Sequence, residues 1–525
     1  MKPDVVVIGA GHNGLIAAAY LAKGGRKTLV LERRERVGGA SVTEELHPGF
    51  RVSSLAHTAG PLRAQVVREL GVNGFETIEP EPRVFAPLPD GRGLCLYGDA
   101  ERTIAELRSF SAKDADRYPA FQKSLTRVAG LVTRVLEMTP PDVDKPGLRD
   151  LWGLLSAGLA FRGLGREDAQ RLLRWGPMAV ADFAAEWFET ELLRAVVCAR
   201  GIRGTFQGPW SAGTTANFLF DAAGSGGNGA GHAVFVKGGL GALAEALAGA
   251  ARRHGAEIRT GAPVTRVVVK DGQVQGVILE SGEEIAVAAV VSGADPKHTF
   301  LKLLDPAVLD PVDLQRIRNY QQTGMCSKVN LALSGLPSFV AMKGRETAVL
   351  HGRIHVGREV DELERAFDDA KYGAFSKRPY LDVTIPSLTD PSLAPAGQHV
   401  MSIYVQYTPA KLRGADWDAK RDEVGDVVLK RLEDYAPGIS GLVVKRQVLT
   451  PLDLERTYGL TEGHPCHGEP ALGQLYAMRP LLGWGRYRGP VKGLFLCGAG
   501  THPGGGVTGA PGANAAREIA RDLGR

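Results

Sequence analysis

Cysteine and long apolar runs are scarce in this sequence, and their scarcity excludes two classes of protein. The five cysteines are widely spaced and form no Cys-x-x-Cys pair, which argues against a dithiol redox enzyme and fits a reducing compartment. The longest helical apolar stretch, Leu151 to Phe161, falls well short of the roughly 20 residues that span a bilayer. No signal peptide is visible, because a short strand and glycines follow Lys2 directly. We therefore expect a cytoplasmic protein with no transmembrane helix.

Long runs of basic residues are also lacking. The 63 basic and 58 acidic residues leave a net charge of only +5, so nucleic acid is not an expected partner. A weak attraction to an anionic membrane surface stays open. The apolar content of 44% and the charged content of 23% are those of a folded globular protein, and 525 residues leave room for two or more cores.

The N-terminus carries a strand-helix-strand pattern with a dinucleotide fingerprint. Its parts are an apolar run (Val5 to Ile8), a Gly9-x-Gly11-x-x-Gly14 turn, a helical run (Leu15 to Ala22), a second apolar run (Thr28 to Leu31) and Glu32. Gly9 permits the tight turn, Gly11 lets backbone approach a pyrophosphate, and Gly14 lets the helix pack on the strand. The free N-H groups of the helix start favour phosphate, and Glu32 is placed to bind a ribose diol.

Two nucleotide cofactors fit the residues that follow Glu32. Arg33, Arg34 and Arg36 suggest a site for the 2′-phosphate of NADP. The Arg36-Val37-Gly38-Gly39 sequence is instead typical of FAD enzymes of the glutathione reductase type, and its position favours FAD.

A second strand, glycine loop and helix start lie near the C-terminus, in GLFLCGAGTHPGGGVTGA (493–510) followed by a helical run from Ala513 to Leu523. One nucleotide phosphate needs only one such loop, so a second one indicates a larger, two-part cofactor. FAD fits, with the ADP half at the first loop and the ribityl chain and pyrimidine edge at the second. A helix N-terminus aimed at that edge stabilises the charge that flavin gains on reduction.

The residues between these loops predict mainly helices from about 66 to 210 and a mixture of strands and helices from 300 to 480. The helix Leu148 to Phe161 is amphipathic and flanked by Arg149, Arg162 and Arg166. It suits a membrane surface, although a helix facing the core of a substrate domain is the commoner explanation. Residues 300–480 are expected to give that domain an apolar wall. A glycine-rich loop, Gly224 to Gly231, predicts a domain boundary.

Beyond that boundary we expect a strand, a helix (Leu240 to His254), a further strand (Glu257 to Arg259) and a hairpin turning at Asp271-Gly272, followed by one strand from Glu283 to Val291. Gly239-x-Gly241 lacks a third glycine, because Ala244 stands in its place, so a second nucleotide site there is disfavoured.

The whole chain resembles the phytoene desaturase-like FAD oxidoreductases. The two glycine motifs, the block HAVFVKGGLGAL (232–243) and the C-terminal GAGTHPGGG carry this resemblance. The chain is most similar to the branch named pyridine nucleotide-disulfide oxidoreductase domain-containing protein 2, through TIPSLTDPSLAP (384–395), YVQYTP (404–409) and DLERTYGLTEGHPCHGE (453–469).

The resemblance implies an α/β fold, in which a discontinuous, glutathione reductase-type, Rossmann-like FAD domain (1–65, 215–300 and 485–525) carries an inserted, partly helical α+β substrate domain (66–214 and 301–484). It also implies a backbone contact from Val264 to adenine. The predicted FAD contacts are Gly9, Gly11, Gly14, Glu32, Arg33, Gly39, Ala40, Val264, Gly500, Val507 and Thr508.

Four potential metal ligands lie together at His464, Cys466, His467 and Glu469. Three of them sit too close together on one loop to surround an ion, so no metal is expected. The resemblance implies that the segment around His467 faces the flavin, where His467 or Glu469 acts as a general base, orients substrate or has a structural role. His57 is a third candidate, with a structural hydrogen-bonding role as the commoner interpretation.

These observations predict an FAD-dependent desaturase or dehydrogenase that transfers hydride from a lipophilic substrate to flavin N5 in an apolar tunnel. A polyene or isoprenoid fits, and oxygen or a quinone is the expected electron acceptor. The alternatives are a flavin amine oxidase-like enzyme, a non-redox isomerase and a lipid-binding protein on the same fold. Peripheral contact with a membrane is compatible with each.

Overall fold

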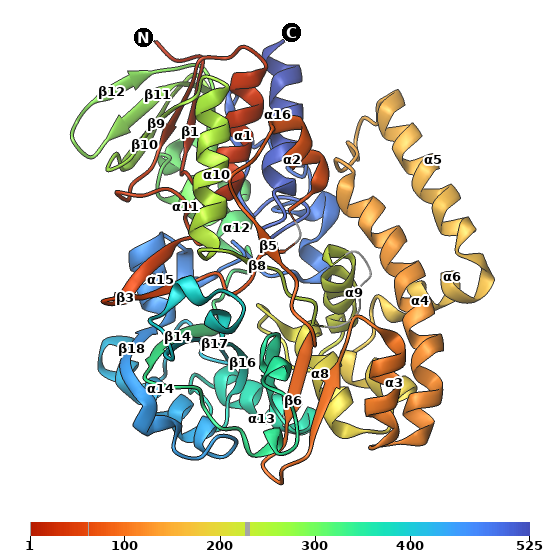
Figure 1. Cartoon of the computed structure of the whole chain (residues 1–525). Helices are drawn as coiled ribbons and strands as arrows, with labels where there is room; N and C mark the ends of the chain where they lie inside the picture. The colour runs from red at the N-terminus through yellow and green to blue at the C-terminus, as the bar shows by residue number, and fades with distance from the viewer. Residues whose placement is uncertain (1, 61, 226–230, 525) are drawn as a thin grey trace.

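The first layer of the molecule is a five-stranded parallel sheet built from both ends and the middle of the chain. The computed structural model describes residues 2–60, 62–225 and 231–524. The strands of this sheet, in spatial order, are β19 (Leu494–Leu496), β13 (Val290–Ser292), β1 (Val5–Ile8), β2 (Thr28–Leu31) and β9 (Glu257–Arg259). The termini lie close together above it (Figure 1). The α/β, Rossmann-like fold predicted from the sequence is confirmed.

Both faces of the parallel sheet are covered. On one face the helices α1 (His12–Lys23), α10 (Leu240–Arg253) and α16 (Ala510–Leu523) bury a cluster rich in alanine and valine. On the other face lies an antiparallel meander of β10 (Val264–Lys270), β11 (Gln273–Leu279) and β12 (Glu284–Ala286). Because both faces are buried, the strands read as continuous apolar runs.

The single strand predicted over residues 283–291 is wrong. Its first part, β12, pairs antiparallel with β11 and is largely exposed, whereas its second part, β13, pairs parallel with β1 and β19 and is fully buried. The chain passes from one sheet to the other between these two strands. A run of β-forming residues does not reveal such a change of partner. The predicted boundary loop, Gly224 to Gly231, lies largely outside the described residues.

A seven-stranded sheet forms the second layer (Figure 1). Its strands, in spatial order, are β18 (Val443–Leu449), β14 (Cys326–Leu333), β17 (His399–Gln406), β16 (Tyr380–Thr384), β15 (Arg353–Val356), β6 (Val84–Pro87) and β7 (Gly93–Leu96). One face buries Val329 and Leu331 against α14 (Trp417–Glu433). Since alternate residues point to opposite faces, the other face carries Lys328 and Asn330, both buried. This face is polar at both positions, and the apolar wall expected of residues 300–480 stays a prediction.

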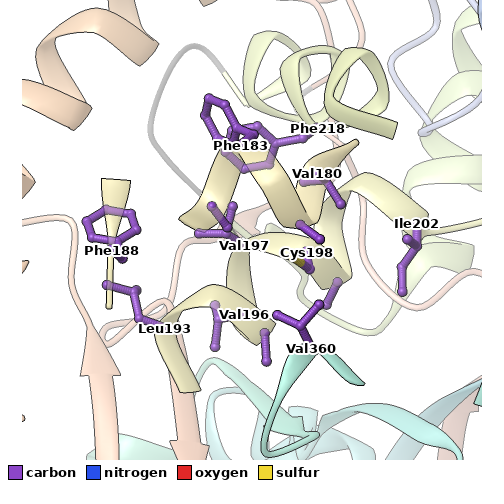
Figure 2. Packing of buried hydrophobic residues seen from close by; sticks show 14 of the residues in the cluster. Val180, Phe183, Phe188, Leu193, Val196, Val197, Cys198, Ile202, Phe218 and Val360 are labelled. Atoms are coloured by element: carbon purple, nitrogen blue, oxygen red, sulfur yellow. The ribbon is translucent and has the colours of Figure 1, made fainter. Parts of the chain in front are cut away.

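The third region is helical and comprises α3 (Ala100–Arg108), α4 (Ala112–Glu137), α5 (Leu148–Gly163), α6 (Gly165–Trp175), α7 (Val180–Trp187), α8 (Glu191–Ile202) and α9 (Thr214–Gly224). Figure 2 shows its core, where Phe183 and Phe218 pack over Val197. The helical pattern of residues 178–199 predicts one continuous helix, but the chain breaks between α7 and α8. The Asp114 carboxylate accepts the N-H groups of Glu189 and Thr190, both at 2.8 Å, and so supports the break.

Helix α5 contradicts the expectation that it faces the core. None of its residues is buried, and it stands at the edge of the molecule beside α4 (Figure 1). No helix in the described part of the chain is both long and apolar enough to cross a bilayer.

The remaining strands and α-helices connect these regions. They are β3 (Thr43–His47), β4 (Phe50–Ser53), α2 (Ala64–Leu70), β5 (Thr77–Ile78), β8 (Phe235–Val236), α11 (Pro296–Leu301), α12 (Pro311–Arg318), α13 (Val360–Lys371) and α15 (Pro451–Tyr458).

Candidate functional site

The first glycine loop joins β1 to α1 and has the shape that a pyrophosphate needs. Gly9 has a φ of +91°, which favours glycine. A Cβ on Gly14 would lie 2.1 Å from the carbonyl oxygen of Gly9, so the helix can pack here only without a side chain. A Cβ on Gly11 would meet no protein atom within 4 Å. The space over Gly11 is therefore open to a ligand at the N-terminus of α1.

Glu32 follows β2 and lies beside this loop. Its Oε2 accepts the N-H of Ala10 at 2.8 Å, and its Oε1 accepts the N-H of Arg34 at 2.9 Å. The carbonyl of Glu32 accepts the N-H of Ala262 at 2.8 Å, which brings the start of β10 at Val264 alongside. The predicted ribose and adenine contacts thus lie at the same edge of the sheet.

The arginines after Glu32 are engaged with protein groups. Arg33 donates to the carbonyl of Thr457 at 2.9 Å, and Arg34 pairs with Glu44 at 2.7 Å. Both side chains therefore have partners other than the 2′-phosphate that NADP would bring. Gly39, with a φ of +57°, sits over Gly11, since its Cβ would lie 3.2 Å from the Gly11 Cα. The carbonyl of the next residue, Ala40, accepts the N-H of Ala56.

The C-terminal glycine loop contacts the segment that follows His57. Gly60 donates its N-H to the carbonyl of Gly506 at 2.8 Å, and Arg63 donates to that of Thr508 at 3.2 Å. Between them Val507 has a φ of +57°. Helix α16 starts just beyond this loop.

The N-termini of α16 and α1 meet directly. A Cβ on Gly512 would lie 2.3 Å from the carbonyl oxygen of Asn13. Both helices therefore direct their positive dipole ends to one region, which suits the phosphates and the electron-rich edge of a reduced flavin. The open cradle over Gly11 and this convergence fit FAD.

A second segment, residues 464–469, packs on the other side of the C-terminal loop. A Cβ on Gly505 would lie 2.7 Å from the sulfur of Cys466, and one on Gly500 would lie 3.2 Å from the carbonyl oxygen of His467. The buried guanidinium of Arg479 donates to the carbonyls of Cys466, at 3.0 Å, and of Ala499, at 2.8 Å. Arg479 thus holds this segment against the loop.

His467 and Glu469 differ in their surroundings. Burial lowers the pKa of His467, Asp295 opposes this effect, and Nδ1 of the histidine has no partner. The pKa of His12 is lowered to about 4, mainly by burial and in smaller part by His467. His467 therefore lies toward the first glycine loop. Glu469 is buried, which raises its pKa to about 7, as suits a carboxyl group that exchanges protons near neutral pH.

His57 lies three residues before Gly60 and is paired with a lysine that the sequence reasoning missed. Nζ of Lys328, on β14, lies 2.8 Å from Nδ1 of His57 and also donates to Oγ of Ser402, on β17. Burial lowers the pKa of Lys328 to about 7, against the pull of Asp382. Burial and Lys328 lower the pKa of His57 to about 3. Because Nδ1 accepts from the lysine, the imidazole proton lies on Nε2.

Charged groups continue behind this pair. Nε2 of His57 lies 3.6 Å from Oδ1 of Asp382, on β16. Asp382 also pairs with Arg353 and lies 3.7 Å from Arg200. Burial alone would raise the pKa of Asp382, but Arg353 and His57 hold it well below its usual range. A lysine among strand-forming residues, within Cys326–Leu333, was the one signal that pointed to this network. Its other members come together only through the pairing of the strands.

The cofactor residues of the two glycine motifs converge. Two further segments contact the C-terminal loop: one follows His57, and the other contains His467 and Glu469. Within the described ranges, no group of three or more histidine, cysteine or acidic residues is arranged to hold a metal ion.

Known proteins match over nearly the whole chain. Pyridine nucleotide-disulfide oxidoreductase domain-containing protein 2 of Rattus norvegicus is 39% identical, with 100% of this chain and 94% of the relative covered. A limonene dehydrogenase subunit from Castellaniella defragrans is 29% identical, covering 99% and 95%. The zeta-carotene-forming phytoene desaturase of Myxococcus xanthus is 28% identical, covering 96% and 90%.

A solved oxidoreductase from Methanosarcina mazei has the same fold, with a TM-score of 0.63 at 18% identity and coverage of 99% and 100%. The family model described as flavin containing amine oxidoreductase matches residues 14–520. The predicted FAD cofactor and the predicted resemblance are both confirmed. The chain is an FAD-dependent oxidoreductase and belongs to the flavin-containing amine oxidoreductase family.

Proposed function

We propose that this enzyme dehydrogenates a lipophilic substrate, with a hydride passing from a C-H bond to N5 of FAD and a proton passing to the chain. When bound, FAD supplies the two-electron acceptor. Limonene and phytoene, which the names of two relatives mention, are both hydrocarbons and support a substrate of this class. Oxygen or a quinone is the proposed acceptor that returns the enzyme to its oxidised form.

The observation that carries the proposal is the Lys328–His57 pair, in which His57 precedes by three residues the Gly60 that contacts the C-terminal glycine loop. A neutral amine has two N-H donors and one lone pair. In Lys328 the donors are directed to Nδ1 of His57 and Oγ of Ser402, so the lone pair is left to accept a proton. The lowered pKa makes this neutral form abundant near pH 7.

The step balances with these groups. The electron pair of one C-H bond leaves with the hydride, the proton of the neighbouring C-H bond is transferred to Nζ of Lys328, and the remaining pair forms the carbon-carbon double bond. His57 and Ser402 orient the amine. Glu469 and His467 remain proposed as a second general base or as groups that orient the substrate.

An anaerobic reduction assay tests the proposal. The holoenzyme is mixed with limonene, phytoene and related terpenoid hydrocarbons, and separately with primary amines, while the flavin absorbance is followed. We expect a hydrocarbon to bleach the flavin and to yield a product with one additional double bond. Bleaching by amines alone would overturn the dehydrogenase proposal in favour of amine oxidation.

The base is tested by Lys328→Met with the substrate that bleaches the flavin fastest. We expect flavin reduction to slow by about 10²-fold or more, as for loss of a general base. In the unchanged enzyme the rate should rise with pH through about 7, because the neutral amine is the reactive form. Lys343→Met, at an exposed position, is the matched control. An unchanged rate in Lys328→Met would remove this lysine from the chemistry.

A further inference from the structure

Helix α5 exposes an apolar face that the rest of the chain leaves uncovered. Leu148 is 81% exposed, Trp152 70% and Leu159 61%. With Leu151 and Leu155 these side chains recur at three- and four-residue spacing, so they lie on one side of the helix. Large apolar side chains gathered in this way mark an interaction surface.

A groove separates this face from α4. It has a volume of about 820 Å³, and Trp152, Leu155 and Leu159 line one side while Leu131 lines the other. The other α4 residues that line the groove include Arg127 and Arg134. The α4 side is therefore largely polar and leaves the apolar side chains of α5 exposed.

Arginines without carboxylate partners surround the exposed face. Among the described residues, no carboxylate oxygen lies within 4.0 Å of Arg149 and Arg162 on α5, of Arg166 just beyond it, or of Arg134 across the groove. The acids of α5 and α6 are already paired, Asp150 with Arg486 at 3.3 Å, Glu167 with Arg171, and Asp168 with Arg127 at 2.8 Å. Further acids, at residues 137–144, lie before the start of α5.

We propose that α5 docks on an anionic phospholipid membrane, with its leucines and Trp152 at the boundary between head groups and acyl chains. An apolar helix face bordered by arginines is the pattern of helices that lie in this interface, and anionic lipid attracts each nearby basic residue. A second copy of the chain is disfavoured as the occupant, because a two-fold interface would place the same arginines opposite one another.

The neighbouring helix α4, which contacts α5, is connected to the cofactor region. Nη2 of Arg63 donates a hydrogen bond to the carbonyl of Leu136, near the C-terminal end of α4, at 3.0 Å. Arg63 belongs to the segment that contacts the C-terminal glycine loop. Membrane docking itself does not depend on which substrate the enzyme oxidises.

Vesicle flotation with the holoenzyme tests the proposal. We expect binding to vesicles of phosphatidylcholine with phosphatidylglycerol, and at least tenfold weaker binding to vesicles of phosphatidylcholine alone. Leu151→Glu with Leu155→Glu should weaken binding by at least tenfold, since two buried apolar groups become charges. Each of Arg149→Gln, Arg162→Gln and Arg166→Gln should weaken it about fivefold at low salt.

The controls separate docking from misfolding and from self-association. Val312→Glu changes an exposed apolar residue on α12 and should leave vesicle binding unchanged. Because α5 is exposed, the flavin spectrum of the double variant should match that of the unchanged enzyme. Flavin-loaded enzyme that binds neither kind of vesicle would overturn the proposal. A dimer that the double variant converts to a monomer, without any vesicle binding, would equally overturn it.

Discussion

At the scale of single residues, two glycines of the first loop differ in the space available for a side chain. A Cβ on Gly14 would strike the Gly9 carbonyl, whereas a Cβ on Gly11 would project into open space. We therefore expect Gly14→Ala to destabilise the FAD-free protein by at least about 1 kcal/mol through overpacking. Gly11→Ala should leave the FAD-free protein as stable as before but weaken FAD binding at least tenfold.

Thermal unfolding of the FAD-free proteins and titration with FAD distinguish these two outcomes. If Gly11→Ala bound FAD as tightly as the unchanged protein, the space over Gly11 would not be the pyrophosphate site. The fold would remain as described, and only the cofactor assignment of this loop would change.

The lowered pKa of Lys328 predicts that folding stability depends on pH, which can be measured without a substrate. Its pKa falls from 10.5 when the chain is unfolded to about 7 in the folded protein. Between these values the unfolded chain binds one more proton at this residue, so its contribution to folding stability rises with pH. Lys328→Met removes the cost of charging a buried amine. We expect the variant to gain more stability relative to the unchanged protein at pH 6 than at pH 9.

Chemical unfolding at several pH values measures this difference, and a pH-independent difference would contradict the prediction. His57 is a contributing group, since it loses its partner in the variant. A comparison of His57→Gln with the double variant isolates the interaction between the two residues.

At the scale of elements, α1 and α16 depend on each other through a close backbone approach. A Cβ on Gly512 would lie 2.3 Å from the Asn13 carbonyl oxygen and would push the two helices apart. We expect Gly512→Ala to cost about 1–3 kcal/mol of stability and to weaken FAD binding, since both helix N-termini shift. Gly249→Ala within α10 is the matched control.

At position 249 the added Cβ would lie 3.4 Å from the end of a flexible arginine, Arg253. A helix-interior alanine should then be neutral or stabilising by about 0.5–1 kcal/mol. Differential scanning fluorimetry of both variants, with and without FAD, makes the comparison. If both variants had the same Tm with FAD and without it, the contact between α1 and α16 would not control the cofactor site.

The elements also show what the sequence predicts well and what it does not. Local patterns suffice for the first glycine loop, for α10 and for the hairpin at Asp271-Gly272, because each is decided by residues close together in the chain. The local pattern left α5 undecided between a core-facing and a surface helix, since amphipathicity gives a face but not its partner. The Lys328–Asp382 network depends on the register of three strands between residues 326 and 406, which no local pattern contains.

At the scale of the whole molecule, FAD should stabilise distant segments together. Its predicted contacts come from residues 9–40, from Val264 and from residues 500–508, so binding favours only the state in which all of them are in place. At free FAD about 100 times the Kd we expect a stabilisation of about 2.7 kcal/mol. Calorimetry with increasing FAD should show a rising Tm for the domain that contains the parallel sheet. A constant Tm across that titration would contradict a folded-state FAD site.

The contact between the first and last helices also sets an order of events during synthesis. Asn13 leaves the ribosome roughly 500 residues before its partner Gly512, and Arg26 likewise waits for the carbonyl of Leu523. Nascent chains that lack α16 have only half of the cofactor cradle. We therefore expect FAD to bind only after α16 has been synthesised, and a chain truncated shortly before α16 to be purified without flavin.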